Sequence, residues 1–318
     1  VAHLPRYAPM ISKVPGLPLL LNLRNHIPLI AKAQEWLTSI SAKRSLPVWR
    51  SKHFWNQDDL PFATPQELAK SNKRVVLFAD TFNAYFENEN LQAALSVLQK
   101  SGYMVHVARP SSSTSNPNSF CCGRTYLAAG MVDEAKSRLA ALIGHLAPYA
   151  EQGIAIVGLE PSCLFTLRDE ALQMGLGPKA ELVSQQAQLL EEFLAKEQKA
   201  GRFTPRFKES AQPILVHGHC HQKAFAAVSP ALELLRLIPN ANPHLIESSC
   251  CGMAGSFGYE VEHIEASKQM AELSLLPTIR KHPDALVVAD GTSCRHQIAD
   301  GACREAMHIA KVLEKCLI

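Results

Sequence analysis

A pair of adjacent cysteines followed by glycine occurs twice in this chain, and it constrains the fold more than any other feature. The first copy is Cys121-Cys122-Gly123 and the second is Cys250-Cys251-Gly252. A Ser-Cys pair follows each copy, with Cys163 lying 41 residues after Cys122 and Cys294 lying 43 residues after Cys251. A repeat of this length predicts two like domains in one chain.

The motifs follow or adjoin apolar runs that are typical of buried strands. These runs cover residues 75–79, 103–107 and 154–159 in the first half, and 214–216, 244–247 and 285–289 in the second. Segments with helical spacing separate them, which favours parallel strands with functional groups at their carboxyl ends. We therefore predict an α/β fold of two like domains related by a pseudo-two-fold axis. Each domain should hold a small, mainly parallel sheet flanked by helices.

The chain of 318 residues is long enough for two domains and a large core. We predict a proline-rich arm or linker with one helix over residues 1–72, a first repeat over 73–205 and a second over 206–318. Residues 1–70 carry nine Lys and Arg against four Asp and Glu. Such a segment suits an acidic partner or an anionic membrane surface, and a solvated linker accounts for it equally well.

The sequence gives no indication of nucleic-acid binding, of a membrane helix or of secretion. The net charge of +3 is too small to indicate nucleic-acid binding. No stretch reaches the roughly 20 apolar residues of a membrane helix, and no secretory signal is visible. We expect a cytoplasmic protein, with peripheral attachment at the inner membrane as an option. Because the chain begins with Val1 rather than Met, we expect it to be part of a longer polypeptide.

Nine cysteines indicate a metal or redox site rather than a disulfide framework. Their number is odd, and adjacent cysteines do not have the geometry to pair readily with each other. Clustered cysteines in a cytosolic α/β protein more often bind metal or take part in redox chemistry. Cys303 and Cys316 lie in a helix-like tail beyond the repeated cysteine motifs, where we expect them to be buried or incidental.

The second half offers four thiols for one site, and we predict them as metal ligands: Cys220, Cys250, Cys251 and Cys294. Thiolates bind both iron–sulfur clusters and zinc. A tight turn at Gly252 would aim the cysteine pair at one centre and let backbone amides reach sulfur. We also expect His219 at the cofactor. The glycine spacing suits an ordinary strand-to-helix turn as well, and a phosphate loop is a weaker alternative.

The first half retains three cysteines, which we predict as a weaker second site: Cys121, Cys122 and Cys163. Thr81 stands where Cys220 stands in the second half, and a threonine does not supply a soft thiolate. Asp80 is a candidate for the open position. Four histidines are spare nitrogen donors near the second site, each more often structural when taken alone: His217, His219, His221 and His296.

The duplicated Cys…Cys-Cys-Gly…Ser-Cys arrangement resembles the cysteine-rich CCG domain pair. That pair occurs in heterodisulfide reductase and in the iron–sulfur subunits of glycolate, lactate and anaerobic glycerol-3-phosphate dehydrogenases. The stretches 217–223 and 250–260 are most similar to the carboxyl-terminal region of bacterial FAD/iron–sulfur oxidases of the D-2-hydroxyglutarate and D-lactate dehydrogenase type. The resemblance covers about residues 73–300. In the reductase each half ends in Cys-x-x-Cys, whereas Thr166 and Gln297 stand at the last positions here, which argues against a five-cysteine cluster.

The resemblance implies an oxidoreductase component. The chain would be the electron-transfer module of a flavin-dependent dehydrogenase acting on D-2-hydroxyglutarate, D-lactate or glycolate. Electrons would pass from flavin through a 4Fe-4S cluster to a quinone or another carrier. FAD and a ferredoxin-type domain would precede this chain in the same polypeptide, so the chain alone would not be catalytically complete. The alternatives are a structural zinc or metal-free interaction domain and, less favoured, a thiol-disulfide reductase using Cys250 and Cys251.

Overall fold

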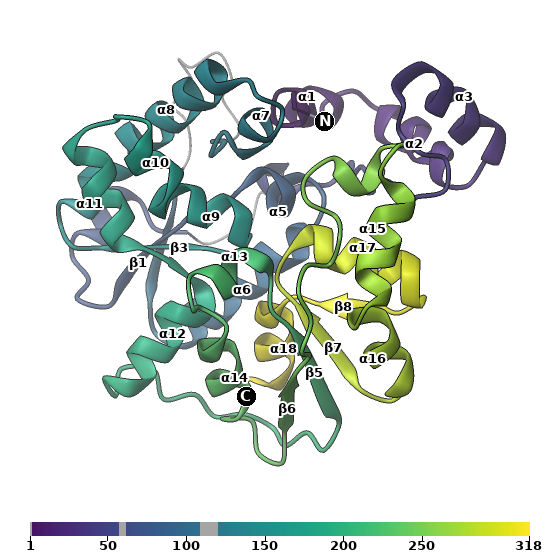
Figure 1. The fold of residues 1–318 in the computed structure, drawn as a ribbon. Coiled ribbons are helices and arrows are strands. Elements are labelled where there is room, and N and C mark those ends of the chain that lie inside the picture. The colour runs from purple at the N-terminus through teal and green to yellow at the C-terminus, as the bar shows by residue number, and fades with distance from the viewer. Residues whose placement is uncertain (1, 57–61, 109–119) are drawn as a thin grey trace. The chain divides into compact units, whose positions relative to one another are not determined.

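The computed structural model describes residues 2–56, 62–108 and 120–318 (Figure 1). The chain divides into two compact units. The first unit comprises Val1–Met10, Lys52–Lys208 and Ala310–Ile318, and the second comprises Ile11–Ser51 and Glu209–Ile309. The predicted boundaries at residues 73 and 206 refer to the duplicated sequence and stay a prediction.

A four-stranded parallel sheet forms the centre of the first unit. Its strands are β1 (Arg74–Leu77), β2 (Met104–Val107), β3 (Ala155–Gly158) and β4 (Ala187–Leu189), in the order β2-β1-β3-β4. The three apolar residues of β1 are fully buried. Continuous apolar strands of this kind are expected where helices cover both faces of a parallel sheet.

The helices of the first unit precede and follow these strands. They are α1 (Leu4–Ile11), η2 (Phe54–Asn56), α4 (Pro65–Leu68), α5 (Thr81–Tyr85), α6 (Asn88–Lys100), α7 (Arg124–Ala128), α8 (Val132–Ala150), α9 (Pro161–Arg168), α10 (Glu170–Gln173), α11 (Pro178–Gln186), α12 (Leu190–Lys199) and α18 (Ile309–Cys316). The expected helical spacing is seen in α6, whose Leu91, Leu95 and Leu98 are buried on one face.

The second unit repeats the same sheet. Its strands are β5 (Pro213–His217), β6 (Asn242–Leu245), β7 (Leu286–Ala289) and β8 (Ala306–Met307), all parallel in the order β6-β5-β7-β8. Its helices are α2 (Leu17–Asn22), η1 (Leu23–Asn25), α3 (Pro28–Thr38), α13 (Cys220–Ala224), α14 (Ser229–Leu235), η3 (Phe257–Tyr259), α15 (Ile264–Glu272), α16 (Leu275–Lys281) and α17 (Thr292–Ala302). In Figure 1, α14 lies on one side of this sheet and α16 on the other.

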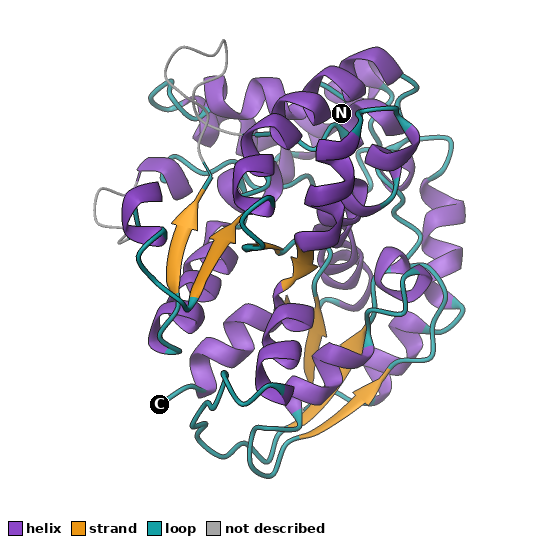
Figure 2. Cartoon of the chain, turned by 90° about the vertical axis from the view of Figure 1, so that its left-hand side faces the viewer, coloured by secondary structure: helices purple, strands orange, loops and turns teal. Residues whose placement is uncertain are grey.

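The predicted fold class is confirmed. Each unit has a four-stranded parallel sheet flanked by helices, and the strand orders correspond position by position. Figure 2 shows in orange that the strands of each sheet run side by side in one direction. The proposed pseudo-two-fold relation between the halves stays a prediction. Among the described residues, no helix combines the length and the apolar character that crossing a membrane requires.

The proline-rich segment 11–51 packs within the second unit, although its sequence suggests an arm or linker. Ile40 forms an antiparallel bridge with Glu260, and the Ser41 amide donates to the Tyr259 carbonyl oxygen at 2.7 Å. The buried Arg24 donates to the carbonyl oxygens of Arg44 and Ser41. These bonds tie the segment to itself and to the loop that follows the second cysteine pair.

Candidate metal centre

The same glycine turn follows both cysteine pairs. Gly252 has φ 86°, and a Cβ atom placed there would lie 2.3 Å from the carbonyl oxygen of Ser267 in α15. Gly123 has φ 83°, and its Cβ atom would lie 2.6 Å from the carbonyl oxygen of Ala135 in α8. Only glycine fits a left-handed backbone pressed so closely against a helix. The expected tight turn at Gly252 therefore occurs in both halves.

The turn also brings backbone amides to sulfur. The Gly252 amide donates to Cys250 Sγ at 3.3 Å, and the Gly123 amide donates to Cys121 Sγ at 3.3 Å. A hydrogen bond of this kind favours the thiolate over the thiol. In each pair the first cysteine is half-buried and the second is buried, so the two thiols face different surroundings.

Helix starts position the other two cysteines of the second unit. Cys220 is the first residue of α13, and Cys294 lies in the first turn of α17. His219 caps α13, because its Nδ1 atom accepts a hydrogen bond from the His221 amide at 3.1 Å. Helix amino termini carry partial positive charge, which favours negative groups such as thiolates nearby.

The four predicted cysteines of the second unit form one contiguous group. The Sγ atoms of Cys251 and Cys294 lie 3.4 Å apart, and both residues are buried. Hydrogen bonding links Cys220 to Cys250, and Cys250 to Cys251. Cys220 is exposed and Cys250 is half-buried, so the group runs from the core to the surface.

The four thiols of this group differ in their pKa values. Hydrogen bonds with Cys220 and Cys251 lower the pKa of Cys250 to about 2. The hydrogen bond with Cys251 likewise places the pKa of Cys294 well below its ordinary value. By contrast, bonding to Cys250 raises the pKa values of Cys220 and Cys251. Close thiolates disfavour one another's charge, so a cation would be needed to hold all four cysteines as thiolates.

His217 adds a nitrogen donor to this group. It is the last residue of β5, and Nδ1 lies 3.0 Å from Ser248 Oγ. Its other nitrogen, Nε2, is buried, and the His217 side chain also interacts with the Cys294 thiol. One ligand atom each of His217, Cys251 and Cys294 lies within 4.8 Å of the others. This donor set of two buried thiols and a buried imidazole fits a thiophilic metal.

A second group of donors lies at the exposed end of the site. The ligand atoms of His219, Cys220 and His221 also lie within 4.8 Å of one another. The ring of His219 stacks on that of His221, with centroids 5.1 Å apart. His296 is engaged elsewhere, because its Nδ1 lies 3.0 Å from the Tyr259 hydroxyl. Within the described part of the chain, His217 is the spare histidine that groups with two buried thiols.

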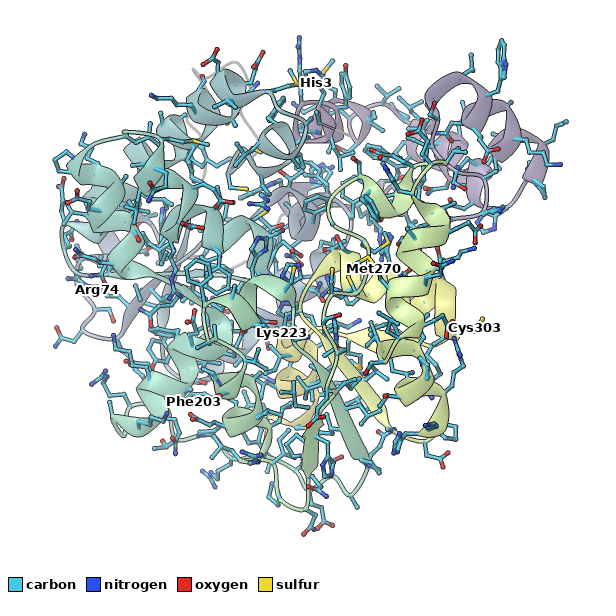
Figure 3. The ribbon with its side chains drawn as sticks, in the orientation of Figure 1. His3, Arg74, Phe203, Lys223, Met270 and Cys303 are labelled. Carbon is cyan, nitrogen blue, oxygen red and sulfur yellow. The ribbon has the colours of Figure 1, made fainter. Side chains whose placement is uncertain are left out.

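Two residues near the site are not indicated by cysteine or histidine spacing. Gln297 stands where the resemblance places a cysteine, and its Nε2 donates to the Cys251 carbonyl oxygen at 2.7 Å. Lys223, labelled in Figure 3, donates to the Ser249 carbonyl oxygen at 2.8 Å and so holds the loop before the cysteine pair. The only sequence signal for Lys223 is its place at the end of the histidine-rich run.

The three cysteines of the first unit also meet. Cys122 is linked by hydrogen bonds to both Cys121 and Cys163. Thr81 is the first residue of α5, the place that Cys220 holds in α13, and its hydroxyl is buried without a partner among the described residues. Burial raises the pKa of Asp80 to about 6. Both Asp80 carboxylate oxygens bind groups of α5, so the carboxylate is already engaged as a helix cap.

The two cysteines beyond the repeated motifs, Cys303 and Cys316, do not join either cysteine group. Cys303 is exposed rather than buried, and Figure 3 places it at the surface, away from Lys223. Cys316 is half-buried at the end of α18. Neither is linked to the cysteines of the two groups by a hydrogen bond among those described.

The fold and the cysteine group together define a cysteine-rich α/β domain. Residues 214–299, which include all four cysteines of the second unit, match the model of the cysteine-rich domain family, CCG. The resemblance to this family that the sequence indicates is therefore confirmed for residues 214–299.

Relatives of known activity match over longer stretches. The chain is 26% identical over 198 residues to one subunit of the anaerobic glycerol-3-phosphate dehydrogenase of Escherichia coli K12, covering 62% of this chain and 49% of the relative. It is 24% identical over 313 residues to the D-2-hydroxyglutarate dehydrogenase of Pantoea ananatis, covering 94% of this chain and 28% of the relative. The E. coli K12 D-2-hydroxyglutarate dehydrogenase is 23% identical over 308 residues, with the same two shares covered. The chain thus spans about half the length of the first relative and less than a third of the others.

Proposed function

We propose that this chain is an electron-transfer module of a dehydrogenase, and that its second unit holds the redox centre. The observation that carries the proposal is the contiguous group of Cys220, Cys250, Cys251 and Cys294, with the buried imidazole of His217 beside it. The similarity to dehydrogenases supports the same class of function. The ligands we propose are the four cysteines, with His219 and Gly252 at the cofactor.

The residues of the chain perform distinct tasks in this proposal. Cys251 and Cys294 hold the buried side of the centre and exclude water from it. The Gly252 amide stabilises charge on Cys250, and the exposed Cys220 lies where an electron carrier can approach. A 4Fe-4S cluster bound here would supply one-electron transfer at a potential tuned by hydrogen bonds to sulfur and by exposure.

The finer assignment follows the D-2-hydroxyglutarate dehydrogenase relatives. We propose that a flavin domain with FAD and a ferredoxin-type domain belong to the same polypeptide, and that the substrate is a 2-hydroxy acid. Electrons would leave through a quinone or another carrier, at a cytoplasmic or peripheral inner-membrane location. In that arrangement the present chain conducts electrons and does not oxidise the hydroxy acid itself.

The test is metal and sulfide analysis of protein purified without oxygen, together with visible and EPR spectra. We expect about four irons per chain bound at thiolates, with an EPR signal that appears on reduction. A colourless protein with stoichiometric zinc would contradict the electron-transfer proposal.

A structural zinc domain is the second candidate. It is favoured by the compact set of His217, Cys251 and Cys294, whose donor atoms lie within 4.8 Å of one another and suit a tetrahedral ion. The metal analysis above separates the two candidates. A thiol-disulfide reductase using Cys250 and Cys251 is the third, and it requires the thiol count of the protein to change between reduced and oxidised samples.

A further inference from the structure

A buried arginine from the proline-rich segment reaches the back of the cysteine turn. Arg44 is buried, and its Nη1 donates to Gln297 Oε1 at 2.6 Å. Its Nη2 lies 3.4 Å from Ser267 Oγ, and Asp300 lies 3.5 Å from Nη1. Arg44 and Gln297 are far apart in sequence, so this contact exists only in the folded second unit.

Gln297 connects this arginine to the cysteine pair. Its Nε2 donates to the carbonyl oxygens of Cys251 and Ser267, at 2.7 and 2.9 Å. Ser267 belongs to α15, the helix against which the Gly252 turn is pressed. One amide group therefore joins the cysteine turn to the helix that supports it.

The guanidinium and the two backbone carbonyl oxygens together fix which way this amide points. A primary amide has an acceptor oxygen and a donor nitrogen of nearly equal size, so packing alone does not select one orientation. A guanidinium has donors only, so the amide oxygen must face Arg44 and the nitrogen must face Cys251. Arg24 in turn donates to the carbonyl oxygen of Arg44, which holds the backbone of the segment in place.

We propose that Arg44 is a positioning residue for the cysteine site, acting through Gln297 on the Cys250–Cys251 turn. Segment 11–51 then helps to position the cysteines of the site. The inference rests on the proposed function in one respect only, namely that the positioned thiols hold a metal. Its first test uses the metal-free protein and is independent of that point.

The experiment compares Arg44→Met with Lys43→Met, a matched control one residue away. Lys43 pairs with Glu265 at the surface, and both of these side chains are more than half exposed, at 64% and 62%. In the metal-free protein, we expect Arg44→Met to make the buried thiols react about tenfold faster with a thiol reagent, because losing a charged hydrogen bond loosens the turn. Lys43→Met should leave the rate unchanged.

Two further variants separate positioning from general stability. Gln297→Met should raise the rate at which the buried thiols react with the reagent, as Arg44→Met does. Because the two residues act in series, the thiols of the double variant should react no faster than those of the faster single variant. Arg44→Lys, which restores a donor to Gln297, should recover part of the protection. The free energy of unfolding and the far-UV spectrum are measured for every variant.

In the metal-loaded protein, Arg44→Met should release metal to a chelator about tenfold faster than the unchanged chain. Additive effects of Arg44→Met and Gln297→Met on the thiol rate would overturn the proposal. So would an Arg44→Met protein that is less stable but keeps full thiol protection. If Arg44→Met does not fold, the Gln297→Met rate decides the matter, and an unchanged rate overturns the proposal. If the protein binds no metal but the thiols of Arg44→Met still react tenfold faster with the reagent, the proposed function is refuted. The positioning role of Arg44 is then still supported.

Discussion

Thr81 and Cys220 hold equivalent places, because each is the first residue of the helix after the first strand of its sheet. The two residues differ in one decisive respect: a thiolate is a strong ligand for iron or zinc and a neutral hydroxyl is a poor one. The first unit thus gathers three thiols and the second gathers four with a buried imidazole. At the residue scale, this asymmetry is the basis for the prediction that the second unit holds the stronger metal site.

We therefore expect Cys251→Ser to lower metal affinity at least about tenfold. Cys122→Ser should lower metal affinity less than Cys251→Ser does, because the first unit lacks a fourth thiolate. The measurement is bound iron and zinc per chain after anaerobic purification, with the exposed Cys303→Ser as the control that leaves metal content unchanged. A greater loss of metal from Cys122→Ser than from Cys251→Ser would reverse the ranking.

At the scale of elements, the glycine turn is the device that both units share. Each turn combines a left-handed backbone with a helix carbonyl oxygen too close for any Cβ atom. Gly153 is a useful contrast within the first unit, since it has φ 68° and nothing within 4 Å of the Cβ position. The two effects, backbone strain and steric overlap, can therefore be separated by substitution.

Gly123→Ala should lower the free energy of unfolding of the first unit by about 3 kcal/mol, because strain and overlap act together. Gly153→Ala should cost about 1 kcal/mol from strain alone. Denaturant unfolding of the two variants, fitted for the first unit, measures the difference. Equal costs would mean that α8 shifts to accommodate the new methyl group, and that the close approach is not a constraint.

At the scale of the whole molecule, the chain divides into two compact units. We therefore expect metal binding to stabilise mainly the unit that holds the metal. A ligand that binds only the folded state stabilises the unit that holds it, by about 4 kcal/mol when its concentration is a thousand times Kd. We expect metal removal by a chelator to lower the unfolding temperature of the second unit and to leave that of the first nearly unchanged. Calorimetry of the loaded and chelated chain, without oxygen, tests this. A shift confined to the first unit would place the stronger site there.

The fold class could be predicted because its signals are local. Apolar runs such as 75–79 and 285–289 and the helical spacing around Leu91 and Leu95 report burial within a few residues. The expected strand 244–247 is less well placed, because β6 covers Asn242–Leu245 and has only one buried residue. Edge strands with exposed side chains leave a weak apolar signal, so their boundaries shift most.

The sequence by itself determined the α/β class, the duplicated pattern and the grouping of the cysteines, since residues that follow parallel strands meet at one sheet edge. Only the tertiary structure decided that residues 11–51 pack within the second unit, that the buried His217 lies beside Cys251 and Cys294, and that Arg44 meets Gln297. The physical reason is distance along the chain. The Arg44–Gln297 bond joins residues 253 positions apart, and no local propensity encodes a contact that forms only when both segments are packed.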